Sequence, residues 1–89
     1  MNVVTLYTKP GCHLCDEVRD VIEEVREEFA FDVDVRDILM DLKDFERYKH
    51  DIPVVLLDGR EIARHRMTAD QLRQDLRAAG VCGYNAGRS

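Results

Sequence analysis

Cys12 and Cys15 are the residues whose type and spacing are best suited to chemistry. Two thiols three positions apart can form a disulfide, ligate a metal or exchange disulfides with another molecule. Closing a loop of about four residues is worth only about 2 kcal/mol in the chain-entropy model, which disfavours a purely structural disulfide. In a reducing compartment such a pair is more often catalytic or metal-binding. The spacing alone leaves these two roles open.

The chain as a whole limits the functions that the pair can serve. With 89 residues, of which 45% are hydrophobic and 35% charged, it is expected to form one globular domain over residues 1–80, followed by a flexible tail over 81–89. The formal net charge of −5 argues against nucleic acid as a partner. The sequence shows no apolar run of membrane-spanning length and no cleavable N-terminal signal. We therefore expect a cytoplasmic monomer that binds neither membranes nor nucleic acid.

The first half of the sequence alternates between strand and helix patterns. The run VVTLY at 3–7 is typical of a buried strand, and TKPG after it has turn chemistry. Apolar residues then recur at helical spacing from Cys15 onward, and strict alternation over 31–37 predicts a half-buried strand. Residues 39–49 predict a short helix. The residues expected to face the core in these three segments are Val18, Val21, Ile22, Val25 and Phe29, then Phe31, Val33 and Val35, then Leu39, Leu42, Phe45 and Tyr48.

The second half predicts a hairpin and a final helix. In VVLLDGREIARH, Asp58-Gly59 separates two apolar runs, so Val54–Leu57 and Glu61–His65 should pair antiparallel. Thr68 is the expected N-cap of a helix that ends at Gly80. The resulting order is β-α-β-α-β-β-α. It predicts an α/β domain with a four-stranded mixed sheet, because the first strand–helix–strand unit should be a parallel crossover, with helices on both faces.

The expected helix boundary gives the two thiols different environments. Cys12 falls at or just before the first helical turn, where backbone N–H groups have no intrahelical partner and carry partial positive charge. This environment favours a thiolate over a thiol. Cys15 is one turn further into the helix and should be more buried. We therefore expect Cys12 to be the more reactive thiol.

Residues 5–18 and 52–58 resemble the glutaredoxin-like branch of the thioredoxin-fold superfamily. The resemblance rests on TLYTKPGCHLC before an amphipathic helix, on DIPVVLLDG, and on the order of elements over residues 2–79. It implies a thiol–disulfide oxidoreductase that acts on protein or low-molecular-weight disulfides. In such a protein Cys12 attacks the substrate disulfide and Cys15 resolves the mixed disulfide.

The resemblance also implies residues that bind the substrate. Pro53 is expected to follow a cis peptide bond and to face the thiols. The backbone of Ile52, with its N–H and C=O groups free, is expected to pair with an extended substrate. Lys9 corresponds to a lysine that contacts glutathione in this family.

Two departures from the family pattern bear on partner and reactivity. The stretch RHRMTADQ lacks the Gly-Gly turn with which glutaredoxins hold glutathione, which argues against glutathione as the physiological reductant. We expect no bound cofactor. The residues between the cysteines are His13 and Leu14, and a protonated His13 is expected to modulate the Cys12 thiolate.

Two other functions remain open at this point. The candidate metal ligands are Cys12, Cys15, His13, His50, His65 and Cys82, but they include no second Cys-x-x-Cys and no histidine pair with zinc-finger spacing. No metal site is therefore expected within one chain, although zinc or an iron–sulfur cluster shared between two chains stays an alternative. The other alternative is a non-catalytic interaction module with inert cysteines.

Overall fold

The computed structural model describes residues 2–83 of the chain, and their elements follow the predicted order. Within these residues no helix has the length and the apolar content that a membrane crossing needs. The elements are β1 (Val3–Thr8), α1 (His13–Arg26), β2 (Asp32–Asp37), the short 3₁₀ helix η1 (Ile38–Met40), α2 (Leu42–Tyr48), β3 (Val54–Leu57), β4 (Arg60–Arg64) and α3 (Ala69–Ala78).

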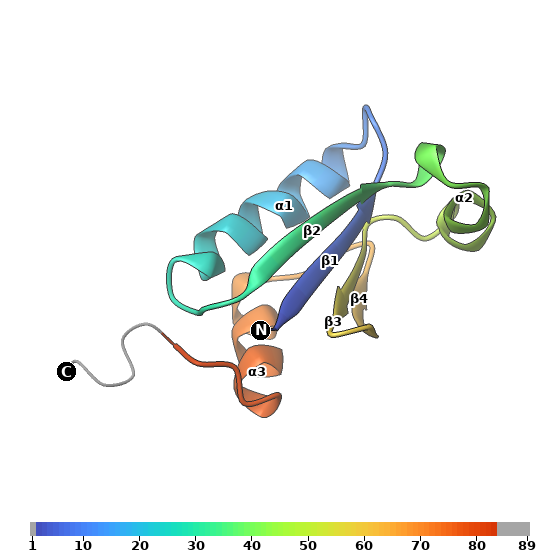
Figure 1. Ribbon diagram of the computed structural model, residues 1–89. Coiled ribbons are helices and arrows are strands. Elements are labelled where there is room, and N and C mark those ends of the chain that lie inside the picture. The colour runs from blue at the N-terminus through green and yellow to red at the C-terminus, as the bar shows by residue number, and fades with distance from the viewer. Residues whose placement is uncertain (1, 84–89) are drawn as a thin grey trace.

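The four strands form one mixed sheet in the order β2-β1-β3-β4 (Figure 1). β1 and β2 are parallel, with Val4 opposite Val33, and are joined through α1. β3 pairs antiparallel with β1 and β4. The predicted α/β class and its parallel crossover are thus confirmed. This topology brings the carboxyl ends of β1 and β2 to the same edge of the sheet.

Helices cover both faces of the sheet, as predicted. Because side chains alternate along a strand, Val4 and Leu6 of β1 face one side and Tyr7 faces the other. The first side packs against α1 and α3 in the larger core. The second packs against η1 and α2 in a smaller cluster, where the rings of Tyr7 and Tyr48 stack with their centroids 4.4 Å apart.

The β3–β4 hairpin turns at the predicted Asp58-Gly59 pair. Both residues have positive φ, 51° and 86°, as a two-residue turn that matches the strand twist requires. The second strand is displaced by one residue from its expected bounds, to Arg60–Arg64. His65 therefore lies just beyond β4.

The helix expected over 39–49 begins at a different residue in the structure, and two of the four residues expected to be buried are exposed. The chain forms η1 first because Asp37 accepts a hydrogen bond from the N–H of Leu39, and α2 begins anew because Asp41 caps its first turn. Leu39 and Leu42, expected to be buried, are 57% and 75% exposed. Ile38 is buried in their place.

The first helix and the second strand also differ from expectation at their ends. α1 ends at Arg26, so Phe29 lies beyond it, yet Phe29 is buried in the larger core. On the expected inner face of the second strand, exposure rises from buried Phe31, just before β2, through half-buried Val33 to Val35, which is 36% exposed.

Residues 81–83, which belong to the expected tail, contact the domain. Gly80 takes a positive φ of 77° after α3, and the N–H of Val81 donates to the C=O of Leu76. The N–H of Ala30 then donates to the C=O of Cys82 over 2.8 Å. Residues 84–89 of the expected tail lie outside the described residues.

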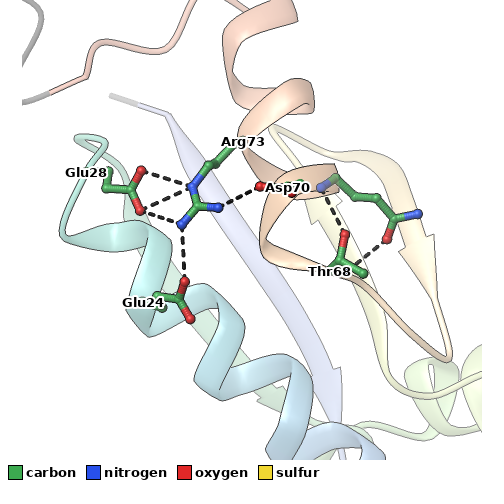
Figure 2. A network of polar contacts seen from close by, with 6 residues as sticks. Glu24, Glu28, Thr68, Asp70 and Arg73 are labelled. Atoms are coloured by element: carbon green, nitrogen blue, oxygen red, sulfur yellow. Dashed lines mark hydrogen bonds and ion pairs between the residues drawn. The ribbon is translucent and has the colours of Figure 1, made fainter.

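Arg73 of α3 joins the two helices that cover the larger core (Figure 2). Its guanidinium donates to Glu28 through Nε at 2.9 Å and Nη2 at 2.7 Å, and also to Glu24 of α1 and Asp70 of α3. The side chain of Arg73 is only 21% exposed. We call this cluster the clamp. Nothing in the sequence pattern indicates it, because Arg73 is 45 positions from Glu28 and 49 positions from Glu24.

The clamp predicts an acid-dependent loss of stability. The hydrogen bonds from Arg73 lower the pKa of Glu28 below its ordinary value of 4.5. A carboxylate with a depressed folded-state pKa stabilises the fold above that ordinary value, and this contribution disappears as pH falls through the folded-state pKa. We therefore expect the free energy of unfolding to fall more steeply below pH 4.5 in the wild-type protein than in Glu28→Gln.

Urea unfolding at a series of pH values measures this difference. Glu23→Gln is the matched control, because Glu23 lies in the last turns of α1, shortly before Glu28, and its contact with Arg26 is long, at 3.9 Å, and exposed. The control should follow the wild-type pH profile. Parallel profiles for the wild type and Glu28→Gln would contradict the role of the clamp.

Candidate active site at the Cys12 and Cys15 pair

Cys12 is the N-cap of α1. Its backbone is extended, with φ −91° and ψ 106°, and its Sγ accepts a hydrogen bond from the N–H of Cys15 at 3.2 Å. The first intrahelical bond runs from the N–H of Asp16 to the C=O of Cys12. The sulfur therefore lies against the positive end of the helix, as the sequence predicts.

The two cysteines are joined by a disulfide, and their Cα atoms are 5.2 Å apart. Their environments differ, since Cys12 is partly exposed and Cys15 is only 1% exposed. Cys12 is therefore the residue of the pair that lies nearer to solvent.

The inner dipeptide lies on the outside of the first helical turn. His13 is the first residue of α1 and is exposed, and within residues 2–83 its ring forms no hydrogen bond or ion pair. Leu14 is also exposed. The predicted effect of His13 on the Cys12 thiolate stays a prediction.

Lys9 is exposed in the loop between β1 and Cys12. This loop turns at Gly11, whose φ of 80° is readily adopted only by glycine. Lys9 lines a shallow hollow of about 290 Å³ that extends from the loop to Asp37 at the end of β2. It thus lies on the β2 side of the cysteine loop.

The Ile52–Pro53 peptide bond is cis, and Pro53 is buried at the start of β3. The strand register places Pro53 at the same end of the sheet as Thr8, since Tyr7 pairs with Val54. Ile52 departs from expectation, because its N–H donates to the C=O of Tyr48 over 3.2 Å instead of being free. Within residues 2–83 its carbonyl accepts no such backbone bond and remains available.

A hollow of about 280 Å³ lies beside the inner dipeptide, between α1 and the segment that links β4 to α3. The sequence pattern did not predict this hollow. The only indication in the sequence is that Leu14 shares a helical face with Val18 and Val21, which form its apolar floor. The residues that line it are Leu14, Glu17, Val18, Val21, His65, Arg66, Met67 and Thr68.

The remaining metal-ligand candidates are dispersed. Among residues 2–83, no three His, Cys, Asp or Glu side chains gather as a metal site would require. Cys82 is exposed and pairs through its backbone with Ala30, before the amino end of β2. The cysteine pair follows the carboxyl end of β1, which is the opposite end of the parallel β1–β2 pair.

Comparisons with solved structures identify the fold. Protein Ne2328 from Nitrosomonas europaea superposes with a TM-score of 0.71 at 20% identity, over 83% of this chain and 89% of that one. A mutant thioredoxin from Halobacterium salinarum gives 0.67 at 18% identity, over 86% and 73%. Glutaredoxin 1 from Francisella tularensis gives 0.50 at 19% identity, over 89% and 96%. At these identities the similarity shows a thioredoxin-like fold alone.

Comparison of the sequence identifies the family. No curated protein shows a significant match. The model of the family described as "Glutaredoxin-like domain (DUF836)" matches residues 3–77, which include the cysteine pair, Pro53 and most of α3. The chain therefore belongs to the glutaredoxin-like domain family.

Proposed function

We propose that this protein is a thiol–disulfide oxidoreductase in which Cys12 attacks and Cys15 resolves. The observation that carries the proposal is the asymmetry of the pair. Cys12 is accessible at the N-cap of α1 and Cys15 is buried within disulfide reach of it. A buried pair of inert cysteines would not leave one sulfur open to an incoming molecule.

The reaction transfers two electrons from the dithiol to the substrate. The Cys12 thiolate attacks one sulfur of the substrate disulfide, forming a mixed disulfide and releasing the other sulfur as a thiolate, which takes up a proton. Deprotonated Cys15 then attacks the Sγ of Cys12 and releases the second substrate thiol. The substrate is reduced to two thiols, and the protein is left with the Cys12–Cys15 disulfide seen in the structure.

The position of Cys12 favours both of its roles. The N–H of Cys15 and the positive end of α1 stabilise negative charge on its sulfur. A stabilised thiolate is more abundant at neutral pH and also leaves more readily from the mixed disulfide. The second effect acts when an outside thiol attacks the substrate sulfur of the mixed disulfide, because Cys12 is then the leaving group, whereas the substrate thiol leaves when Cys15 attacks.

The substrates are protein or low-molecular-weight disulfides, bound between the cysteine loop and the start of β3. Ile52 supplies a carbonyl for an extended chain, and Pro53 lies directly before the first residue of β3. Glutathione is disfavoured as the reductant that regenerates the dithiol, because the stretch RHRMTADQ lacks the Gly-Gly turn with which glutaredoxins hold glutathione. Lys9 is the remaining candidate for a glutathione contact.

Turnover with different reductants tests this proposal. With hydroxyethyl disulfide as substrate, we expect catalysed reduction when dithiothreitol regenerates the protein. With glutathione we expect a weak rate that rises linearly with concentration, because a saturable binding site is lacking. Absence of catalysis with both donors would refute the oxidoreductase assignment. Saturable glutathione dependence would refute the choice of donor only, and Lys9→Ala would then test for loss of that binding.

A further inference from the structure

His65 holds a backbone conformation that the hairpin does not explain. Its φ is 70°, and the N–H of Arg66 donates to the C=O of Arg64 across it over 2.8 Å, which closes a three-residue turn. Such turns with positive φ are rare and strained for residues other than glycine. Asp58, which also has a positive φ, lies in the hairpin turn, where this conformation is required.

His65 also contacts residues 50–53, the segment proposed above to bind the substrate, at two points. Its N–H donates to the C=O of Pro53 over 2.7 Å, and its Nε2 lies 3.3 Å from the C=O of His50. Since a carbonyl oxygen only accepts, Nε2 must carry the hydrogen in this contact. His65 therefore spans residues 50–53, the segment that contains the cis bond.

Charged neighbours fasten this segment to the end of β4. Arg64 contacts Asp51 at 3.2 Å and forms a two-pronged bond with Glu61 at 2.6 and 2.7 Å. The bond from Arg64 lowers the pKa of Glu61 and so keeps that carboxylate ionised. The carboxylate of Asp51 also lies 3.9 Å from Nε2 of His65. Arg64 and His65, which are neighbours in the sequence, thus both contact residues 50–53.

Resting on the function proposed above, we propose that His65 is a positioning residue for docking of extended peptide substrates. Its ring immobilises residues 50–53, so that the carbonyl of Ile52 is presented in a fixed direction. Its turn also directs Arg66, Met67 and Thr68 to the wall of the hollow beside Leu14. A small disulfide without a peptide backbone does not need this alignment.

Three variants separate the turn from the ring. His65→Gly keeps the positive φ at no strain and removes only the ring. His65→Gln retains a side-chain amide N–H that can reach the position occupied by Nε2 of His65. His50→Gln is the matched control, because His50 contributes its carbonyl to the contact and this remains. The substrates are a fluorescent peptide disulfide and hydroxyethyl disulfide, both reduced with dithiothreitol as the regenerating donor.

For His65→Gly we expect the KM for the peptide disulfide to rise about fivefold, as loss of one hydrogen bond predicts, with kcat unchanged. The KM for hydroxyethyl disulfide and the alkylation rate of Cys12 by iodoacetamide should stay at the wild-type values. His65→Gln should restore most of the peptide KM. Equal rises for both substrates, or no rise, would overturn the proposal.

Amide hydrogen exchange provides a readout that does not depend on catalysis. The N–H of Ile52 is bonded to Tyr48 within the held segment, so its exchange should be about fivefold faster in His65→Gly and unchanged in His50→Gln. Unchanged exchange would overturn the positioning role whatever the activity. Faster exchange in a protein that reduces no disulfide would support the immobilisation of residues 50–53 by His65 while refuting the oxidoreductase function.

Discussion

Cys12→Ser is expected to reduce disulfide turnover to the rate measured without protein, while leaving α1 intact. Cys12 has two roles, nucleophile and N-cap, and serine retains only the second because its hydroxyl is among the best N-cap acceptors. Loss of activity in this variant therefore reports loss of the thiolate and not of the helix start. Urea unfolding under reducing conditions should give a wild-type midpoint. Residual turnover would show that another thiol attacks.

Cys15→Ser is expected to stop the reaction one step later. The buried Cys15 is not needed for attack, so the variant should form a mixed disulfide with the substrate and retain it. Mass spectrometry should find one substrate thiol per chain, attached at Cys12. Both variants are made with Cys82→Ser, which removes the exposed third thiol. Attachment at an equal level in Cys12→Ser would contradict the assigned order.

The reactivity of Cys12 follows from the same geometry. In reduced Cys15→Ser with Cys82→Ser, only Cys12 titrates as a thiol. We expect its pKa, measured from thiolate absorbance, to lie below the ordinary value of about 8.5. The physical cause is the helix end and the N–H that donates to its sulfur. A value at or above about 8.5 would contradict the proposed mechanism.

The sequence predicted the fold where local signals agree with tertiary packing. Asp58-Gly59 identified the hairpin, and Thr68 identified the start of α3, where its side chain and Gln71 complete a capping box. The segment 38–48 was predicted poorly because Asp37 and Asp41 each cap a helix there. Periodicity does not show which of two caps sets the register, so Ile38 was missed as a buried residue.

The candidate site was predicted only as far as local sequence extends. Cys12 and Cys15 are close in sequence, and their position at a strand–helix junction follows from pattern. The bond from Ile52 to Tyr48 and the contacts of His65 depend on how separate segments meet, and no spacing rule indicates them. The positive φ of His65 is equally invisible, because histidine shows no glycine-like signal for it.

Leu72→Ala is expected to destabilise the protein by about 2–5 kcal/mol, the range for deleting a fully buried leucine side chain. Leu72 is completely buried in the larger core, where α3 packs beside α1 on the sheet. A domain of this size has a free energy of unfolding of only about 5–15 kcal/mol, so the loss is a large fraction of the total. Urea unfolding in reducing buffer measures it without a contribution from the disulfide.

Leu42→Ala makes the same chemical change on the surface. Leu42 is 75% exposed at the start of α2, and alanine has a high helix propensity, so we expect a change within about 0.5 kcal/mol. The pair of variants also tests the structure against the sequence pattern, which placed Leu42 on a buried helix face. A destabilisation of Leu42→Ala comparable to that of Leu72→Ala would mean that α2 packs through Leu42. The register set by the Asp41 cap would then be wrong.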